Sequence, residues 1–458
     1  MDLVTALRID PAIVPEPRLA FVGAGGKTTA LFQAARGWLG LSEKTGRSVV
    51  LACATTHFAK SQLALADRFF IAPTSADFTR LESGSPDGLI LFSGPLMTDE
   101  RTQGLDGVSL AKVHLLAEKL KTALFLESDG SRRLPLKAPA DHEPAIPPWV
   151  SQVVVVAGLS GLGKPLDDEH VHRSQVFARL SGLRLGAPID ASSLVGVLNH
   201  GQGGLKGIPV GARRVVMLNQ ADTPDLQSRA SALARQLLEA YDAVLICALE
   251  PASPDIPAGV LAVHEPVAGI ILAAGASRRL GRPKQLLEWR GEPLIRHVVK
   301  TAVEAGLQPL RIVTGACAQD VESALQGLPG KIVYNDRWES GQAASVIAGL
   351  ESLPAACGAA VFLLADQPQV PATLLASLVA RHAQSLAPLV APMIDGRRAN
   401  PVLFDRRTFD DLRRLEGDTG GRPLFARYRA EWLPWHDANI LLDVDSEQDY
   451  QRLLELDG

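Results

Sequence analysis

Residues 269–286 decide the fold of the second half of this chain, and they read GIILAAGASRRLGRPKQL. The stretch begins as an apolar run over 269–274, which is typical of a buried parallel β-strand. It then becomes a loop of small residues, whose backbone can approach a phosphate closely and whose free N–H groups can bind anions. Arg279 and Lys284 can reach over the same phosphates, and we expect the next helix to begin near Pro293.

The same stretch resembles the L-A-A-G-x-S-x-R-x-G-x-x-K signature of nucleotidyltransferases with a Rossmann-like fold, and most closely that of the MocA-type molybdenum cofactor cytidylyltransferases. The resemblance assigns Arg279 and Lys284 to catalysis. The alternative is an ordinary strand-to-helix turn with surface arginine and lysine. The positions that the resemblance assigns to nucleotide binding here are Leu272, Ala273, Ala274, Gly275, Ser277 and Gly281.

Length and composition bound the class of protein. At 458 residues the chain is too long for one ordinary core, so two domains are expected. The net charge of −4 gives no indication of nonspecific nucleic-acid or membrane binding. The four cysteines form no C-x-x-C pair, which fits a reducing cytoplasm better than a zinc site or a disulfide framework. We find no secretory-signal pattern and no apolar run long enough to span a bilayer.

A second glycine-rich loop follows a strand candidate at 18–22 and reads GAGGKTT. Strand, glycine-rich loop, Lys-Thr and helix is the order of elements in a P-loop, where amides and a lysine hold phosphates and a threonine can hold Mg²⁺. Phe21 stands where the usual glycine would be, so we expect a shortened loop. A glycine-rich turn with a solvated lysine is the alternative. The residues predicted to bind a second nucleotide here are Gly23, Gly25, Gly26, Lys27, Thr28 and Thr29.

Acidic residues follow the next core strand predicted, at 123–126. Glu127 and Asp129 are candidates to hold Mg²⁺ or to orient water near the phosphates. Residues 136–144 then combine Lys, Asp, His and Glu between prolines, which is unusual for a plain linker, although a surface charge cluster is the alternative. Residues 219–222, Asn-Gln-Ala-Asp, resemble the N-K-x-D base-reading element of GTPases with glutamine in place of lysine.

These segments together resemble the YqeC family, which is associated with the maturation of selenium-dependent or molybdenum hydroxylases. The resemblance covers roughly residues 15–250, and the elements that carry it lie at 23–29, 127–144, 161–173 and 219–222. It implies a P-loop-like domain but no particular reaction. A second nucleotide hydrolase and a binding module therefore both stay open.

The proline-rich segment 250–257 breaks regular structure, and we place the domain boundary near residue 262, with one domain over 1–261 and the other over 262–458. After it, apolar strand candidates alternate with helical patterns. This alternation predicts an α/β fold, a mostly parallel sheet with helices on both faces, whose ligands bind at the carboxyl ends of the strands. The strands predicted are 311–314, 331–333 and 359–364.

Two aspartates are expected to hold Mg²⁺ at that edge. The strand predicted at 359–364 ends just before Asp366 and so places it at the carboxyl edge, where a carboxylate can bind a Mg²⁺ that bridges a triphosphate. Residues 443–449, DVDSEQD, resemble the V-D-T-P-E-D ending of related transferases, in which Asp445 matches the second metal ligand. The alternatives are a hydrogen-bonded loop aspartate and a helix N-cap.

Three further stretches resemble binding elements of the same family. Residues 335–345 match its W-x-x-G-x-x-x-S element, which implies that Gly341 and Ser345 contact the base or the ribose; a structural tryptophan and a helix cap are the alternative. Residues 397–404 and 417–422 match elements on the acceptor side, which could organise a phosphorylated, polar pterin, or could be surface turns. The acceptor-binding residues so implied are Arg398, Asn400, Asp418 and Arg422.

The resemblance implies that the terminal phosphate of molybdopterin attacks the α-phosphate of CTP, with Mg²⁺ bound and pyrophosphate leaving. Ala274 favours CTP over GTP, since guanylyltransferase relatives carry glycine there and a Cβ would crowd a purine. The rival activities are transfer to another phosphorylated acceptor and redox chemistry on a nicotinamide cofactor. A nucleotide-dependent chaperone that hands the cofactor to an apo molybdenum hydroxylase, or to its maturation chaperone, is the non-enzyme alternative. We expect small-molecule substrates. We expect neither nucleic acid nor a membrane as a binding partner.

Overall fold

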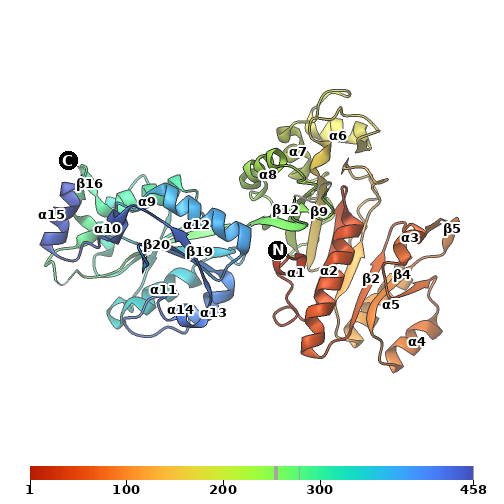
Figure 1. Ribbon diagram of the computed structural model, residues 1–458, viewed down its shortest axis with the longest axis horizontal. Coiled ribbons are helices and arrows are strands. Elements are labelled where there is room, and N and C mark those ends of the chain that lie inside the picture. The colour runs from red at the N-terminus through yellow and green to blue at the C-terminus, as the bar shows by residue number, and fades with distance from the viewer. Residues whose placement is uncertain (99, 252–255, 278, 457–458) are drawn as a thin grey trace. The chain divides into compact units, whose positions relative to one another are not determined.

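A computed structural model describes residues 1–98, 100–251, 256–277 and 279–456. The chain divides into two compact units, Met1–His264 and Glu265–Gly458, each with its own sheet and its own hydrophobic core (Figure 1). Both sheets are mostly parallel, which confirms the predicted α/β class. No helix within the described ranges is both long enough and apolar enough to cross a membrane.

The first unit is built on a nine-stranded sheet in the order β13-β12-β11-β9-β1-β7-β2-β4-β3. Its neighbouring strands run parallel except for β12 and β13, which are antiparallel. The predicted domain boundary near residue 262 lies inside β13. The strands are β1 (Arg18–Gly23), β2 (Val49–Ala54), β3 (Arg68–Ile71), β4 (Gly88–Ser93), β7 (Leu124–Glu127), β9 (Gln152–Gly158), β11 (Arg213–Asn219), β12 (Ala243–Ala248) and β13 (Gly259–His264).

Every residue of β2 and β9 is buried, which requires cover on both faces of the sheet. Helices provide much of that cover, and a short parallel pair, β8 (Leu136–Lys137) with β10 (Val171–His172), lies outside the main sheet. A two-stranded hairpin of β5 (Leu96–Thr98) and β6 (Arg101–Thr102) follows β4. The helices are α1 (Leu3–Ala6), α2 (Lys27–Ser42), α3 (Lys60–Leu63), α4 (Ser75–Ser83), α5 (Gly107–Lys119), α6 (Ser174–Ser181), α7 (Ala191–Leu198) and α8 (Pro224–Leu237).

The second unit has an eight-stranded sheet in the order β18-β17-β14-β19-β22-β20-β21, with β23 also pairing with β20. The parallel part, β18 to β19, matches the predicted alternation of strands and helices. The antiparallel extension formed by β20, β21 and β22 was not predicted. The strands are β14 (Val267–Ala273), β17 (Leu310–Thr314), β18 (Lys331–Tyr334), β19 (Ala359–Leu364), β20 (Leu389–Ile394), β21 (Arg397–Arg398), β22 (Val402–Asp405) and β23 (Ala430–Pro434).

Helices α9, α10 and α11 connect the parallel strands, and α9 begins directly after Pro293, as predicted. A small hairpin, β15 (Glu288–Trp289) with β16 (Glu292–Pro293), precedes it. The helices are α9 (Leu294–Glu304), α10 (Ala318–Ala324), α11 (Gln342–Glu351), α12 (Ala372–Ser385), α13 (Phe409–Leu412), α14 (Leu424–Arg427) and α15 (Glu447–Glu455).

The core of the second unit lies on both sides of its sheet. Successive side chains of a strand point to opposite faces, so the neighbours Ile270 and Ile271 belong to two different buried clusters. Ile271 packs in the cluster that contains Val299 of α9, and Ile270 in the cluster that contains Val346 of α11. Because both faces are covered, polar groups of these strands reach solvent mainly at the strand ends.

Candidate functional site

The loop after β14 is shaped by its own side chains. The hydroxyl of Ser277 accepts the backbone N–H of Lys284 at 2.9 Å. Gln285 is buried and points its amide nitrogen at the carbonyl oxygens of Ala273 and Gly275, 3.4 Å from each. This glutamine was not predicted as a site residue, because a polar side chain beside a signature lysine is indistinguishable in sequence from a surface residue.

Lys284, Asp366 and Asp445 meet at the carboxyl edge of the sheet. The ammonium of Lys284 donates to a carboxylate oxygen of Asp366 and, at 2.7 Å, to Oδ1 of Asp445. Asp366 follows β19 and is only 6% exposed. Arg279 lies further out, with a guanidinium nitrogen 4.0 Å from the Asp445 carboxylate. The structure thus brings the predicted catalytic residues and the predicted metal ligands into one cluster, and Ser446 rather than Asp445 caps α15.

A third carboxylate, Asp443, stands beside this cluster and was not predicted. It accepts a 2.6 Å hydrogen bond from the amide nitrogen of Gln367. Burial raises the pKa of Asp443, and the neighbouring carboxylates of Asp366 and Asp445 raise it further. Burial alone would lower the pKa of Lys284, but its two aspartate partners outweigh burial and raise the pKa.

The donor set of the cluster fits Mg²⁺. Magnesium is usually held by one or two carboxylates and completes its octahedron with water and substrate phosphate oxygens. Asp366 and Asp445 offer two carboxylates that share one cationic partner. Within the described residues, no three His, Cys, Asp or Glu side chains are grouped as a ready-made metal cage. Such a site would therefore depend on ligands that a nucleotide supplies.

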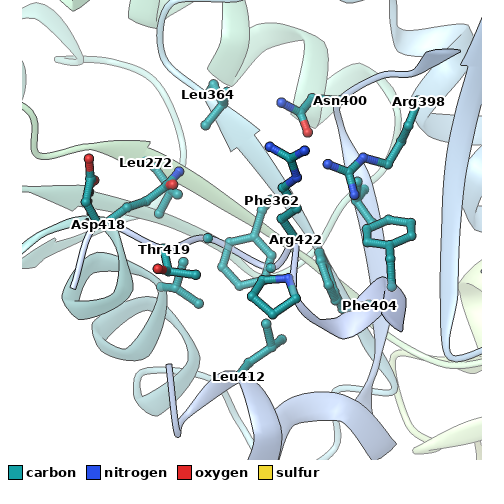
Figure 2. Close-up of a pocket in the computed structure, with 17 residues that line it drawn as sticks. Leu272, Phe362, Leu364, Arg398, Asn400, Phe404, Leu412, Asp418, Thr419 and Arg422 are labelled. Atoms are coloured by element: carbon teal, nitrogen blue, oxygen red, sulfur yellow. Dashed lines mark hydrogen bonds between the residues drawn. The ribbon is translucent and has the colours of Figure 1, made fainter. Parts of the chain in front are cut away.

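A cavity of about 690 Å³ opens beside the ends of β14 and β19 (Figure 2). Its walls include the apolar side chains of Leu272, Phe362 and Phe404, which provide flat and hydrophobic contact area. All four predicted acceptor residues line it, from β21, the turn before β22 and the loop after α13. They are Arg398, Asn400, Asp418 and Arg422.

The cavity is positively charged on one side. The Arg398 guanidinium lies 4.3 Å from the centre of the Phe425 ring. Burial lowers the pKa of Arg398, and the charge of Arg422 lowers it further. Two guanidinium groups that face one cavity favour an anionic ligand, such as a phosphate. Asp418 also lines the cavity, and its Oδ1 accepts the backbone N–H of Gln342 at 3.4 Å.

Gly341 and Ser345 make contacts within the protein in this structure. Gly341 has a φ of +114°, and a Cβ there would lie 2.4 Å from the Gly417 carbonyl, so the glycine permits close contact with the acceptor loop. The hydroxyl of Ser345 is buried and accepts a 3.0 Å hydrogen bond from the Asn335 amide. Their contact with a base or ribose stays a prediction.

Ala274 is packed against the loop that follows β17. Its carbonyl accepts the backbone N–H of Ala316 at 3.2 Å. A Cβ on Gly315 would lie 2.8 Å from the Ala274 carbonyl and 2.7 Å from Trp338. Ala274 is buried in this tightly packed region, and its influence on the choice of base stays a prediction.

The first unit carries its own phosphate-loop geometry. Gly26, with a φ of +118°, precedes α2 as its N-cap. The amides of Gly23, Ala24 and Gly25 donate to the Asp129 carboxylate and to backbone carbonyls. The amides of residues 26–29 have no hydrogen-bond acceptor among the described residues. The predicted loop therefore offers its amides from residue 26 onward, at the positive end of a long helix.

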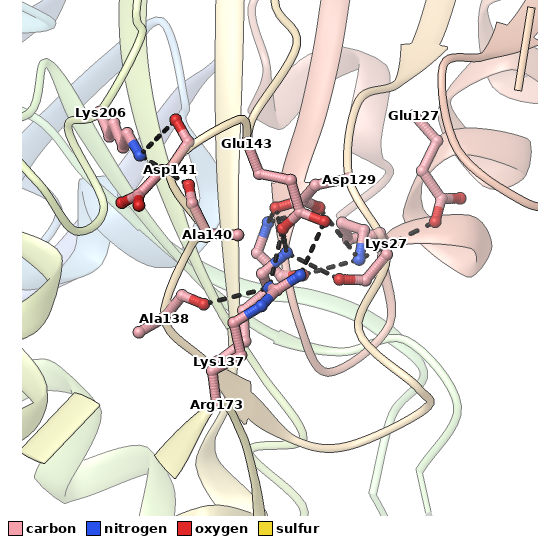
Figure 3. Close-up of polar contacts among 12 residues, drawn as sticks. Lys27, Glu127, Asp129, Lys137, Ala138, Ala140, Asp141, Glu143, Arg173 and Lys206 are labelled. Carbon is pink, nitrogen blue, oxygen red and sulfur yellow. Dashed lines mark hydrogen bonds and ion pairs between the residues drawn. The ribbon is translucent and has the colours of Figure 1, made fainter. Parts of the chain in front are cut away.

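The structure brings Lys27, Glu127 and Asp129 together (Figure 3). Lys27 is 3% exposed, donates to the Gly23 carbonyl at 2.6 Å and lies 3.3 Å from Asp129 and 3.8 Å from Glu127. The hydroxyl of Thr28 donates to Glu127 at 2.8 Å. Burial raises the pKa of Glu127. The Thr29 hydroxyl points elsewhere, 3.3 Å from Glu250, so its predicted part in nucleotide binding is not supported by a shared contact.

The ion pairs continue inward from this loop (Figure 3). Lys137 donates to Asp129 at 2.7 Å and to Glu143 at 2.9 Å, and its side chain is 3% exposed. Arg173 binds both oxygens of Glu143, at 2.8 and 3.0 Å. Lys137 and Glu143 of the segment 136–144 therefore belong to a buried ion network, whereas Asp141 and His142 are exposed, as the alternative of a surface charge cluster expected. Lys137 and Arg173 were not predicted as site residues.

Asn219 holds the loop in place. Its amide nitrogen donates to the Gly25 carbonyl at 2.8 Å, and its oxygen accepts the backbone N–H of Leu249 at 3.2 Å. The next residue, Gln220, receives a 2.6 Å hydrogen bond from the Ser160 hydroxyl. Within the N-K-x-D-like element, Asn219 thus supports the loop.

We expect acid to destabilise the first unit. Burial, together with the charges of Arg173 and Lys137, lowers the pKa of His172 from 6.5 to about 4. The unfolded chain binds this proton below about pH 6.5, whereas the folded unit binds it only below about pH 4, so the free energy of unfolding should fall between these values. Burial would raise the pKa of Glu143, but Arg173 and Lys137 hold it at about 2, so a second loss follows below pH 4.5.

Urea unfolding between pH 7 and pH 4 measures this dependence. His172→Gln should flatten the slope between pH 6.5 and pH 4, whereas His142→Gln, at an exposed position, should leave it unchanged. If the free energy of unfolding of His172→Gln depended on pH as steeply as that of the wild type, the assignment of the lowered pKa to His172 would be contradicted.

The two units define two classes of protein. A parallel sheet with a small-residue loop, a lysine and two aspartates at its carboxyl edge defines a nucleotidyltransferase domain, and the first unit is a second mostly parallel α/β domain with a glycine-rich loop before α2. The chain belongs to both corresponding families: residues 269–432 match the MobA-like NTP transferase domain, and residues 19–175 match the YqeC protein family.

Known relatives cover the two units separately. The chain is 34% identical over 220 residues to an uncharacterized protein YqeC of Escherichia coli (strain K12), covering 47% of this chain and 81% of that protein. It is 32% identical over 203 residues to nicotine blue oxidoreductase of Paenarthrobacter nicotinovorans, covering 41% of this chain and 96% of that protein. It is 34% identical over 144 residues to molybdenum cofactor guanylyltransferase of Serratia proteamaculans (strain 568), covering 31% of this chain and 68% of that protein.

Proposed function

We propose that the second unit transfers CMP from CTP to the terminal phosphate of molybdopterin, giving molybdopterin cytosine dinucleotide and pyrophosphate. One observation carries this proposal: the charged cavity and the carboxylate cluster share the end of β19. Leu364, the last residue of that strand, lines the cavity, and Asp366 follows it two residues later. An acceptor phosphate bound by Arg398 and Arg422 would thus lie at the same edge of the sheet as a triphosphate bound at the carboxylate cluster.

The reaction needs no protein nucleophile. An oxygen of the acceptor phosphate forms a bond to the α-phosphorus of CTP, the bond from that phosphorus to the β-phosphate oxygen breaks, and pyrophosphate leaves with the electron pair. The chain aligns the two phosphates and neutralises charge, with Lys284 and Arg279 as the cations. Asp366 and Asp445 would hold Mg²⁺, which would supply further charge neutralisation on the triphosphate.

The molybdenum cofactor is favoured as acceptor by two features. The guanylyltransferase relative from Serratia proteamaculans acts, by its name, on that cofactor. The cavity itself pairs apolar and aromatic walls with two arginines, which suits a flat heterocycle that carries a phosphate. Another phosphorylated acceptor, or another nucleotide, is the alternative within the same chemistry.

Redox chemistry is a second candidate, because nicotine blue oxidoreductase resembles this unit over nearly its whole length. Hydride transfer on a nicotinamide cofactor needs no pair of metal-binding carboxylates. The convergence of Lys284, Asp366 and Asp445 therefore favours nucleotidyl transfer. Oxidation of NADH or NADPH by the chain, followed at 340 nm with an electron acceptor, would favour the redox activity.

For the first unit we propose a second nucleotide site on the loop that contains Lys27 and Thr28. The free amides of residues 26–29 would bind phosphate, and the Thr28–Glu127 pair would be the place for Mg²⁺. A unit of this kind could hydrolyse the nucleotide or use it to hand the finished cofactor to an apo molybdenum hydroxylase or to its maturation chaperone. We also propose a cytoplasmic location, because all four cysteines are free, as is usual in a reducing compartment.

The deciding experiment incubates the full chain with molybdopterin, Mg²⁺ and either CTP or GTP, and determines the mass of the product. We expect the cytosine dinucleotide and pyrophosphate with CTP, and little product with GTP. Ala274→Gly should narrow the preference by about tenfold, since one methyl group discriminates by about 1–3 kcal/mol at most. No dinucleotide with either nucleotide would overturn the proposal.

A further inference from the structure

One cation holds the two predicted metal ligands together. The ammonium of Lys284 donates to Asp366 and to Asp445, and no other Lys, Arg or His in the described ranges is recorded within hydrogen-bond distance of either carboxylate. Asp443 adds a third negative group close by. A divalent ion that bridges Asp366 and Asp445 would need the space and the lone pairs that the ammonium now uses.

The side chain of Lys284 is able to move away from the two aspartates. Its backbone is fixed, since its N–H donates to the Ser277 hydroxyl, while its flexible side chain is one-quarter exposed. The loop that carries it is the loop predicted to bind the triphosphate. A bound triphosphate offers the ammonium a new anionic partner, and it brings a divalent ion that can replace the ammonium between the aspartates.

We propose that Lys284 acts as a resident cation that excludes free divalent metal from the carboxylate pair until a nucleotide draws the lysine away. This inference rests on the metal site of the proposed function. Metal and nucleotide then bind in a coupled manner, and thermodynamic linkage requires that each raise the affinity of the chain for the other. The lysine thus has a role before the reaction, as a placeholder, in addition to neutralising charge during it.

Removing the ammonium should change metal binding in the absence of any nucleotide. Lys284→Met leaves Asp366, Asp443 and Asp445 without their shared cation. Because an opposite charge in direct contact is worth roughly one to several kcal/mol, free Mn²⁺ should bind this variant at least about tenfold more tightly than the wild-type chain. The wild-type chain should gain affinity for Mn²⁺ only when a non-reacting CTP analogue is present.

The test is a titration of the full chain with Mn²⁺, in which electron paramagnetic resonance measures the free ion. Lys300→Met is the matched control, because it removes a lysine that pairs with Glu292 on the same unit. Its Mn²⁺ affinity should equal that of the wild type. Adding Asp445→Asn to Lys284→Met should abolish the gain, which places the new ion on the carboxylate pair.

Each outcome bears on the inference. Equal or weaker Mn²⁺ binding in Lys284→Met than in the wild type overturns it. Should that variant lose its folded circular dichroism spectrum, Lys284→Gln, which keeps a hydrogen-bond donor, provides the same comparison. If the wild type transfers CMP but Lys284→Met binds Mn²⁺ no more tightly than the wild type, only the proposed role of Lys284 as a placeholder is rejected. If Lys284→Met binds Mn²⁺ more tightly but the wild type does not transfer CMP, the exchange of the ammonium for a metal ion is supported and the proposed reaction is rejected.

Discussion

Asp366→Asn should reduce CMP transfer by about a thousandfold or more while the second unit stays folded. The aspartate is the buried member of the carboxylate pair, at 6% exposure, and it contacts Lys284 directly. Removing one preorganised electrostatic group from a comparable site costs about 10²–10³ in rate, and here the metal ligand and the partner of the lysine are lost together. Single-turnover release of pyrophosphate measures the effect.

The control is Asp410→Asn on α13, which removes an exposed carboxylate that pairs only with Arg413 among the ion pairs observed. Its rate should match the wild type. A thermal melt separates loss of chemistry from loss of fold, and we expect the two variants to melt within a few degrees of the wild type. Near-normal turnover in Asp366→Asn would remove Asp366 from the proposed site and, with it, the assignment of the reaction.

The second large effect is on stability, in the first unit. Lys137→Met should lower its free energy of unfolding by about 3–5 kcal/mol, the usual result of removing one partner from a buried ion pair. Lys137 is the shared partner of Asp129 and Glu143, and its side chain is 3% exposed. After the substitution, Lys27 would be the remaining cationic partner of Asp129, and Arg173 that of Glu143, among the ion pairs observed. Hydrogen exchange of peptides from β1 and β7 in the full chain measures the loss.

Lys206→Met is the matched control, because that lysine donates to the carbonyls of Ala140 and Asp141 on the same segment and pairs with no carboxylate among the contacts observed (Figure 3). It should cost only about 1.5–3 kcal/mol, because hydrogen bonds from an ammonium are lost but no buried carboxylate is left without its partner. Equal protection of β1 and β7 in Lys137→Met and in the wild type would show that the buried network contributes little to stability.

Much of the fold could be read from local patterns. Apolar runs predicted the central strands β1, β7, β14 and β19 within a few residues, because a strand buried on both faces must be apolar throughout. The antiparallel strands β20 and β22 were missed, since their pairing depends on residues far apart along the chain. The family resemblance, carried by short motifs, is confirmed in both halves.

The candidate site was predictable as a set of residues and not as an arrangement. Resemblance to family motifs named Lys284, Asp366 and Asp445 from three distant segments. The parallel pairing of β14 and β19 explains why Lys284 and Asp366 meet, since the carboxyl ends of neighbouring strands share one edge, whereas Asp445 reaches them from the segment before α15. Asp443 and Gln285 escaped prediction, because only packing distinguishes a buried polar side chain from an exposed one.

The order of residues alone specified two α/β domains, two phosphate-type loops and the acidic groups near them, because these depend on local composition and on strand periodicity. Tertiary structure alone decided which charges are partners. It buried Lys137 between Asp129 and Glu143, turned Asn219 onto the first loop and set the ammonium of Lys284 between two aspartates. The energy of a charge depends on its distance to other charges and on its contact with water, and folding sets both quantities.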